Sequence, residues 1–132
     1  MLRRLPERLR PALDGFREVL GHVERARRAL TDAVPTTRLP GRPLAEALLL
    51  FEDELSAAER SMPSWRDDAL EAVWRSCSDA IVDARRQAER LRLRPHEPDG
   101  FEGLIGSIGD VLAPLEAFGR AGDRFRMLAR RR

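Results

Sequence analysis

The chain has 132 residues, of which 42% are hydrophobic and 35% are charged. These values fit one folded domain with a single core and exclude an intrinsically disordered chain. The 24 basic residues, all arginines, face 22 acidic residues, and the net charge of +2 is smaller than the clustered excess of a strong nucleic-acid binder.

Lys, Asn and Tyr are absent from the chain, and all three have AT-rich codons. This composition is typical of a GC-rich bacterial genome. The use of arginine for every cation therefore does not by itself indicate phosphate recognition.

A first amphipathic helix is predicted over residues 5–34. Its apolar residues recur in alternating steps of three and four, which is typical of a helix that buries one face in a bundle. This face comprises Leu9, Ala12, Phe16, Val19, Val23, Ala26, Leu30 and Ala33. Pro11 fits the first turn of this helix. Pro35 is expected to end it, because a proline disfavours the helical conformation of the residue before it.

A second helix is predicted over residues 43–61, after the linker PTTRLPGRP at 35–43. Its core face comprises Leu44, Leu48, Phe51, Leu55, Ala58 and Met62. Three consecutive acids follow a run of leucines in ALLLFEDEL (47–55). At about 100° per residue their carboxylates diverge around the helix, so they cannot share one metal ion. Glu52 and Glu59 lie beside the core face, where we expect ion pairs with arginines.

A third helix is predicted over residues 65–93, with Ser64 and Asp67 in the spacing of a capping box. Its core face comprises Leu70, Trp74, Cys77, Ile81, Ala84, Ala88 and Leu91. Cys77 is the sole cysteine, which excludes an intramolecular disulfide and fits a cytoplasmic protein. Because it occupies a core position, we expect a buried structural thiol and not a reactive thiolate.

A fourth helix is predicted over residues 100–130, and its core face comprises Phe101, Leu104, Ile108, Val111, Leu115, Phe118 and Phe125. Pro114 lies inside this pattern, which predicts that the helix is kinked or split there. No segment alternates with a period of two, so no strand is predicted. Four amphipathic helices with short connections predict an all-α, antiparallel up-and-down four-helix bundle that occupies residues 1–132 as a single domain.

The sequence lacks the patterns of several function classes. No apolar stretch approaches the roughly 18 residues of a transmembrane helix, and no signal peptide follows the N-terminal arginines, so we expect a cytoplasmic protein. A di-iron bundle needs Glu-x-x-His pairs, and the sequence has none. A helical nucleotide pyrophosphohydrolase needs a denser acidic motif than FEDELSAAE (51–59) and SDAIVD (78–83) provide. We therefore predict no catalytic residues, no metal site and no cofactor.

One spacing in the first predicted helix matches a ribonuclease motif. Four residues separate Arg17 from His22 in REVLGH. This spacing resembles the Arg-x4–6-His motif of the HEPN family of helical ribonucleases, and the resemblance implies phosphate binding and acid–base chemistry by the pair. The motif of that family lies on a late helix with a polar residue such as Asn or Asp after the arginine, whereas here Glu18 follows Arg17 on the first helix. A helical hydrolase is therefore the third hypothesis, behind two binding functions.

The first hypothesis is a non-enzymatic bundle that acts in protein–protein association, as a homodimer or with another helical protein. Leu49 and Leu50 point away from the predicted core beside charged residues, which is typical of an interaction surface, unless the 35–43 linker or the N-terminal segment covers them. Small residues on the outer side of the fourth helix permit close approach of another helix. The candidate interaction face comprises Leu49, Leu50, Asp53, Gly103, Gly106, Ala113 and Ala117.

The second hypothesis is binding of nucleic acid or of an anionic surface through arginines near the two termini. Both termini lie at the same end of an antiparallel four-helix bundle, so the two clusters would merge into one basic patch. No aromatic residue interrupts the last three arginines, which argues against base stacking. The candidate anion-binding residues are Arg3, Arg4, Arg130, Arg131 and Arg132.

Overall fold

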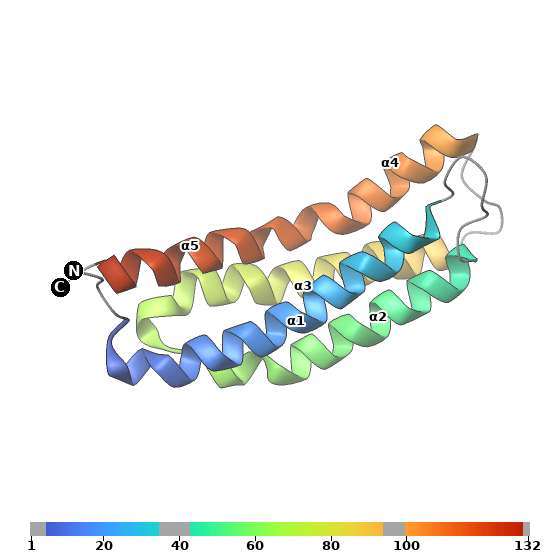
Figure 1. The fold of residues 1–132 in the computed structure, drawn as a ribbon. Helices are drawn as coiled ribbons and strands as arrows, with labels where there is room; N and C mark the ends of the chain where they lie inside the picture. The colour runs from blue at the N-terminus through green and yellow to red at the C-terminus, as the bar shows by residue number, and fades with distance from the viewer. Residues whose placement is uncertain (1–4, 35–42, 94–99, 131–132) are drawn as a thin grey trace.

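The computed structural model describes residues 5–34, 43–93 and 100–130, and within these ranges every regular element is a helix. The α-helices are α1 (Arg10–Ala33), α2 (Leu44–Ser61), α3 (Glu71–Arg92), α4 (Gly100–Leu112) and α5 (Ala117–Arg130). The 3-10 turns are η1 (Glu7–Leu9), η2 (Met62–Trp65), η3 (Asp68–Leu70) and η4 (Ala113–Glu116). With α4 and α5 forming the fourth rod, the predicted all-α four-helix bundle is confirmed (Figure 1).

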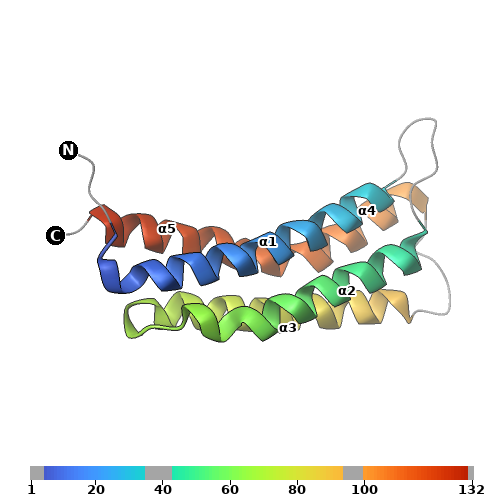
Figure 2. The same ribbon diagram turned by 60° about the horizontal axis from the view of Figure 1, so that its bottom comes forward.

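Neighbouring rods differ in how closely their backbones approach. α1 packs against α2 along most of its length, α2 packs against α3, and α3 packs against both α4 and α5. Within the described ranges α1 has no comparable backbone contact with α4 or α5, although these rods lie next to each other (Figures 1 and 2). On three sides of the bundle the backbones therefore approach closely, and we call the fourth side, between α1 and the α4–α5 rod where they are more widely spaced, the open side.

Aromatic side chains fill the core at the end of the bundle where η1 and the C-terminal end of α5 lie (Figure 1). The centroid of the Phe16 ring is 4.9 Å from that of Trp65 and 5.0 Å from that of Phe125. Trp65 is completely buried, whereas the sequence pattern placed Trp74 on the core face. Trp74 is instead half-buried, and its indole N–H donates a hydrogen bond to the carbonyl oxygen of Met62. The buried tryptophan thus comes from the connection between α2 and α3.

α3 begins at Glu71 and not at residue 65, because two 3-10 turns occupy the predicted first turns of this helix. The side chain of Asp67 caps η3 by accepting a hydrogen bond from the Ala69 N–H, and this bond lowers the pKa of the Asp67 carboxyl group. Ser64 caps no helix, since its hydroxyl donates to a backbone carbonyl three residues earlier. The predicted capping box is therefore wrong, and these polar residues close tight turns.

The 3-10 turn η4, which contains Pro114, separates α4 from α5. Proline has no N–H for the helical hydrogen bond, so an interruption here has a local cause. A 3-10 turn rotates by about 120° per residue, roughly 20° more than an α-helix, and this displaces the side chains that follow around the rod. Ala117, predicted on the outer side of the helix, is accordingly buried in the core, and its assignment to an outer face is wrong.

Candidate interaction surfaces

Two adjacent leucines lie on the side of α2 that faces away from the core. Leu49 is 48% exposed and Leu50 is 38% exposed, whereas Leu48 and Phe51 on either side of them are completely buried. Asp53, one helical turn after Leu49, is exposed as well. We name Leu49, Leu50 and Asp53 the α2 outer face.

The small residues predicted on the fourth helix do not share one environment. Gly106 and Ala113 are exposed, and a methyl group added at Gly106 would meet no atom within 4 Å. Gly103 is half-buried, and Ala117 belongs to the core. The residues that remain at the surface are Gly106 of α4 and Ala113, the first residue of η4, and we name these two the α4 outer face.

The α2 and α4 outer faces are separate surfaces. α2 and α4 occupy diagonally opposite positions in the bundle, since each packs against α3 and their described residues make no extended contact with each other (Figure 1). Their outward sides therefore face in opposite directions. A helical wheel gives the direction of a side chain around its own helix but not the position of that helix, which is why the sequence combined them into one face.

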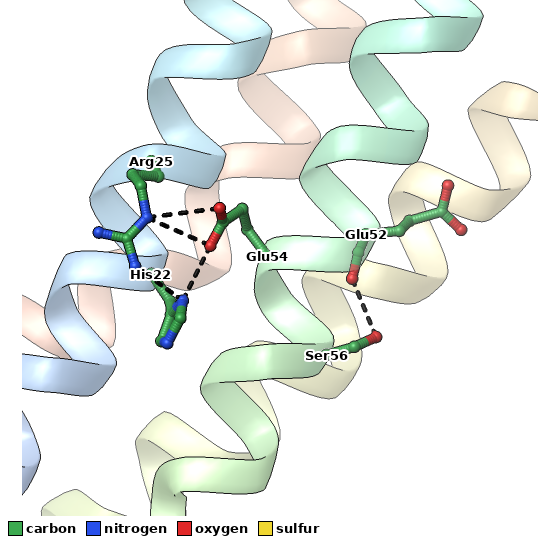
Figure 3. Close-up of polar contacts among 5 residues, drawn as sticks. All are labelled: His22, Arg25, Glu52, Glu54 and Ser56. Carbon is green, nitrogen blue, oxygen red and sulfur yellow. Dashed lines mark hydrogen bonds and ion pairs between the residues drawn. The ribbon is translucent and has the colours of Figure 1, made fainter.

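Glu52 and Glu54 of FEDEL point to different sides of α2, as predicted (Figure 3). Glu54 points toward α1, where its carboxylate lies 2.8 Å from Nδ1 of His22 and 3.4 Å from Nε of Arg25. Glu52 points to the opposite side and accepts two hydrogen bonds from Arg92 of α3, at 2.7 and 3.2 Å. Among the described residues, no group of three or more His, Cys, Asp or Glu side chains is arranged to hold a metal ion.

The cluster of His22, Arg25 and Glu54 links α1 to α2 (Figure 3). Partial burial acts to raise the pKa of Glu54, but the hydrogen bond with His22 and the charge of Arg25 outweigh it, and the pKa lies below its usual value. Nδ1 of His22 is also 2.9 Å from a terminal nitrogen of Arg25, so it donates to the carboxylate or accepts from the guanidinium according to its tautomer. These charges are satisfied within the cluster, which stabilises the contact between the two helices.

The predicted ion pairs of Glu52 and Glu59 with arginines are confirmed, and both join α2 to α3. The Glu59–Arg85 pair has an N–O distance of 2.5 Å, and its two side chains are 48% and 40% exposed. The Glu52–Arg92 pair is better shielded, at 16% and 26% exposure, and it has two hydrogen bonds. Exposed pairs contribute about 0–1 kcal/mol to stability, so the Glu52 pair is expected to be the stronger of the two.

The structure does not bring Arg17 and His22 together. Residues five apart lie about 140° apart around an α-helix. His22 contacts Glu54 of α2, whereas Arg17 lines a groove beside Phe125 of α5. The two side chains therefore face different neighbours, and the geometry gives no support to the ribonuclease hypothesis.

Cys77 is completely buried on the core side of α3, as predicted. Burial raises the pKa of its thiol to about 12, and the positive charge of Arg120 opposes only part of this shift. The thiol is therefore protonated at neutral pH. A protonated, inaccessible sulfur is not a nucleophile, so Cys77 is a packing residue.

The predicted anion-binding arginines lie mostly outside the described residues, and these are Arg3, Arg4, Arg131 and Arg132. Arg130 is described, and it is the exposed last residue of α5. It lies at the same end of the bundle as η1 (Figure 1). Anion binding at this end stays a prediction.

Comparison of the chain with protein-family models, with characterised proteins and with solved structures gave no match. Among the described helices, none combines the length and the apolar character that crossing a membrane requires. The functional argument therefore rests on the surfaces and side chains described above.

Proposed function

We propose that this protein is a non-enzymatic bundle that acts by binding another protein through the α2 outer face. The observation that supports this most is the exposure of two adjacent leucines in the middle of an amphipathic helix. α2 already attaches to the bundle through Leu48, Phe51 and Leu55, all completely buried, so its folding does not require Leu49 and Leu50. Burying apolar surface stabilises an association by about 25 cal/mol per Å² before the costs of binding.

The charges around the leucines suggest the chemistry of the partner. Glu46 and Asp53 are exposed on the same side of α2. In an antiparallel pairing of two copies centred on Leu49 and Leu50, Glu46 of one copy would face Asp53 of the other, and like charges in an interface oppose binding. A helix with an apolar ridge and a basic rim is therefore a better match than a second copy.

The test is a double variant, Leu49→Asp with Leu50→Asp. Both residues are exposed, so the melting temperature should change little, while partner binding should be lost. A photo-crosslinking amino acid in place of Ala45, which is exposed one helical turn before Leu49, identifies the partner and leaves Glu46 and Asp53 in place. The captured protein should present a helix with apolar and basic residues. Capture should fall in the double variant and as salt rises.

Met127→Asp is the matched control, because Met127 is 50% exposed on α5, away from this face. It should leave capture unchanged. Equal capture by wild type and the double variant would contradict the proposal. Sedimentation analysis tests whether the face binds a second copy of this chain. If the wild type is a dimer and the double variant is a monomer, the partner is a second copy and not another protein.

A further inference from the structure

A groove on the open side of the bundle runs between α1 and α5. Its volume is about 300 Å³, which lies at the lower limit of the size range of small-molecule sites. The groove lies toward the end of the bundle where η1 and the C-terminal end of α5 are found (Figure 1).

Residue size explains why space remains here. The Phe16 and Phe125 rings, with centroids 5.0 Å apart, hold the two helices apart at the base of the groove. The α5 wall then presents Gly122 and Ala129, which are too small to fill the gap. A methyl group added at Gly122 would lie 3.8 Å from the nearest atom, a guanidinium nitrogen of Arg126.

The opposite wall of the groove is apolar. Leu13 and Leu20 on α1, together with Leu5 before η1, line it and are half-buried. Half-buried leucines along a concave surface favour an apolar occupant, since each gains from further removal of water. The wall thus suits a hydrocarbon chain or ring.

Two arginines line this apolar groove and give it positive charge. Arg17 lies on the groove side of α1 between Leu13 and Leu20, and it has no ion pair or hydrogen bond with another described residue. Arg126 lines the α5 side and pairs with Asp123. A guanidinium that has no ionic partner among the described residues and lies beside an apolar groove is complementary to an anionic head group.

We infer that this groove binds a small amphipathic anion, with its apolar body between the walls and its carboxylate or phosphate head on Arg17. This inference is independent of the proposed partner surface, which lies on the outward side of α2. The two are separable, because variants of one surface leave the other intact.

The test uses decanoate, decyl phosphate and decanol below their aggregation concentrations, followed by NMR of the two indole N–H groups. Trp65 packs 4.9 Å from Phe16, so its indole signal should shift on binding, more than that of Trp74. Both anions should bind more tightly than decanol, and their ratio identifies the preferred head group. Arg17→Gln should weaken anion binding about threefold to tenfold and leave decanol unaffected.

Gly122→Leu is designed to fill the groove and should weaken all binding at least tenfold. Gly119→Leu is the matched control on the same helix, because Gly119 is exposed with no atom within 4 Å of an added methyl group. Ala129→Leu provides a second obstruction should the first variant fold poorly. The inference is overturned by absence of any shift, by equal binding of decanol and the anions, or by unchanged binding in a folded groove-filling variant.

Discussion

α1 meets its two neighbours in different ways. Toward α2 and η2 the backbones approach closely, and a methyl group added at Gly15 would lie 2.8 Å from the carbonyl oxygen of Ser64. Toward α5 the rings of Phe16 and Phe125 separate the helices, and a groove remains. Both sides continue the same buried face of α1, so the size of the side chains at each contact decides whether a side of the bundle is closed or open.

Polar contacts follow the same division. On the closed side, His22 and Arg25 of α1 bind Glu54 of α2. On the open side, Arg17 lacks an ionic partner in the described part of the chain. Close backbones bring side chains of opposite charge within reach of each other, whereas a groove leaves a cation available to a ligand.

The largest expected effect is that of Trp65→Ala. This substitution removes a ring that packs on Phe16 of α1 and on Phe125 of α5. Trp65 is completely buried and packs on Phe16 and Phe125, so the loss should be about 3–5 kcal/mol of unfolding free energy. Urea unfolding followed by circular dichroism measures it. Trp74→Ala is the control with a smaller loss because Trp74 is half-buried, and an equal loss in both variants would contradict the assignment.

The next prediction compares the effect of a glycine-to-alanine substitution on stability at the closed side and at the open side of α1. Gly15→Ala on the closed side should destabilise the protein by about 1–3 kcal/mol, because the methyl group collides with the Ser64 backbone. The measurement is thermal or urea unfolding.

Gly122→Ala is the counterpart on the open side, and it should stabilise the protein by up to about 1 kcal/mol. Its methyl group makes only ordinary contacts, and alanine favours the helix over glycine. The same sign for both substitutions would show that the two sides do not differ in packing as described.

The smallest expected effect concerns Glu54 on the closed side. Its pKa lies below the ordinary value of 4.5, so its ion pairs stabilise the fold above pH 4.5, and this contribution is lost as the pH falls below that value. Glu54→Gln should therefore lower stability at pH 7 by up to about 1 kcal/mol, with the difference from wild type shrinking in acid.

Denaturant midpoints between pH 3 and 7 measure this dependence. Asp53→Asn is the control, because it removes the neighbouring exposed carboxylate of α2 and leaves the cluster of His22, Arg25 and Glu54 intact. A pH-independent difference between Glu54→Gln and wild type would refute the role of the carboxylate charge.

The hydrophobic period predicted the helical rods and most of the core, because an amphipathic helix must bury its apolar side whatever its neighbours are. It failed at the connections. Trp65 follows no helical period because it sits in a 3-10 turn, and the rotation introduced by η4 moved Ala117 into the core. A helical wheel assumes about 100° of rotation per residue throughout, so it does not predict the position of side chains in or after a 3-10 turn.

The candidate surfaces show the same limit. Exposure of Leu49 and Leu50 follows from their direction on α2, and the sequence was sufficient to predict it. The separation of Gly106 from these leucines depends on which helices are diagonal, and the groove beside Arg17 depends on the distance between α1 and α5. Neither quantity is encoded in the period of a single helix.

The sequence by itself therefore determined the number of rods, their buried faces and the divergence of the acids in FEDEL, since these follow from about 100° of rotation per residue. Only the tertiary structure decided that Glu54 pairs with His22, that Trp65 fills the core and that one side of the bundle stays open. The physical reason is that these features arise from side-chain volumes meeting across helices, and such contacts exist only once the helices have packed.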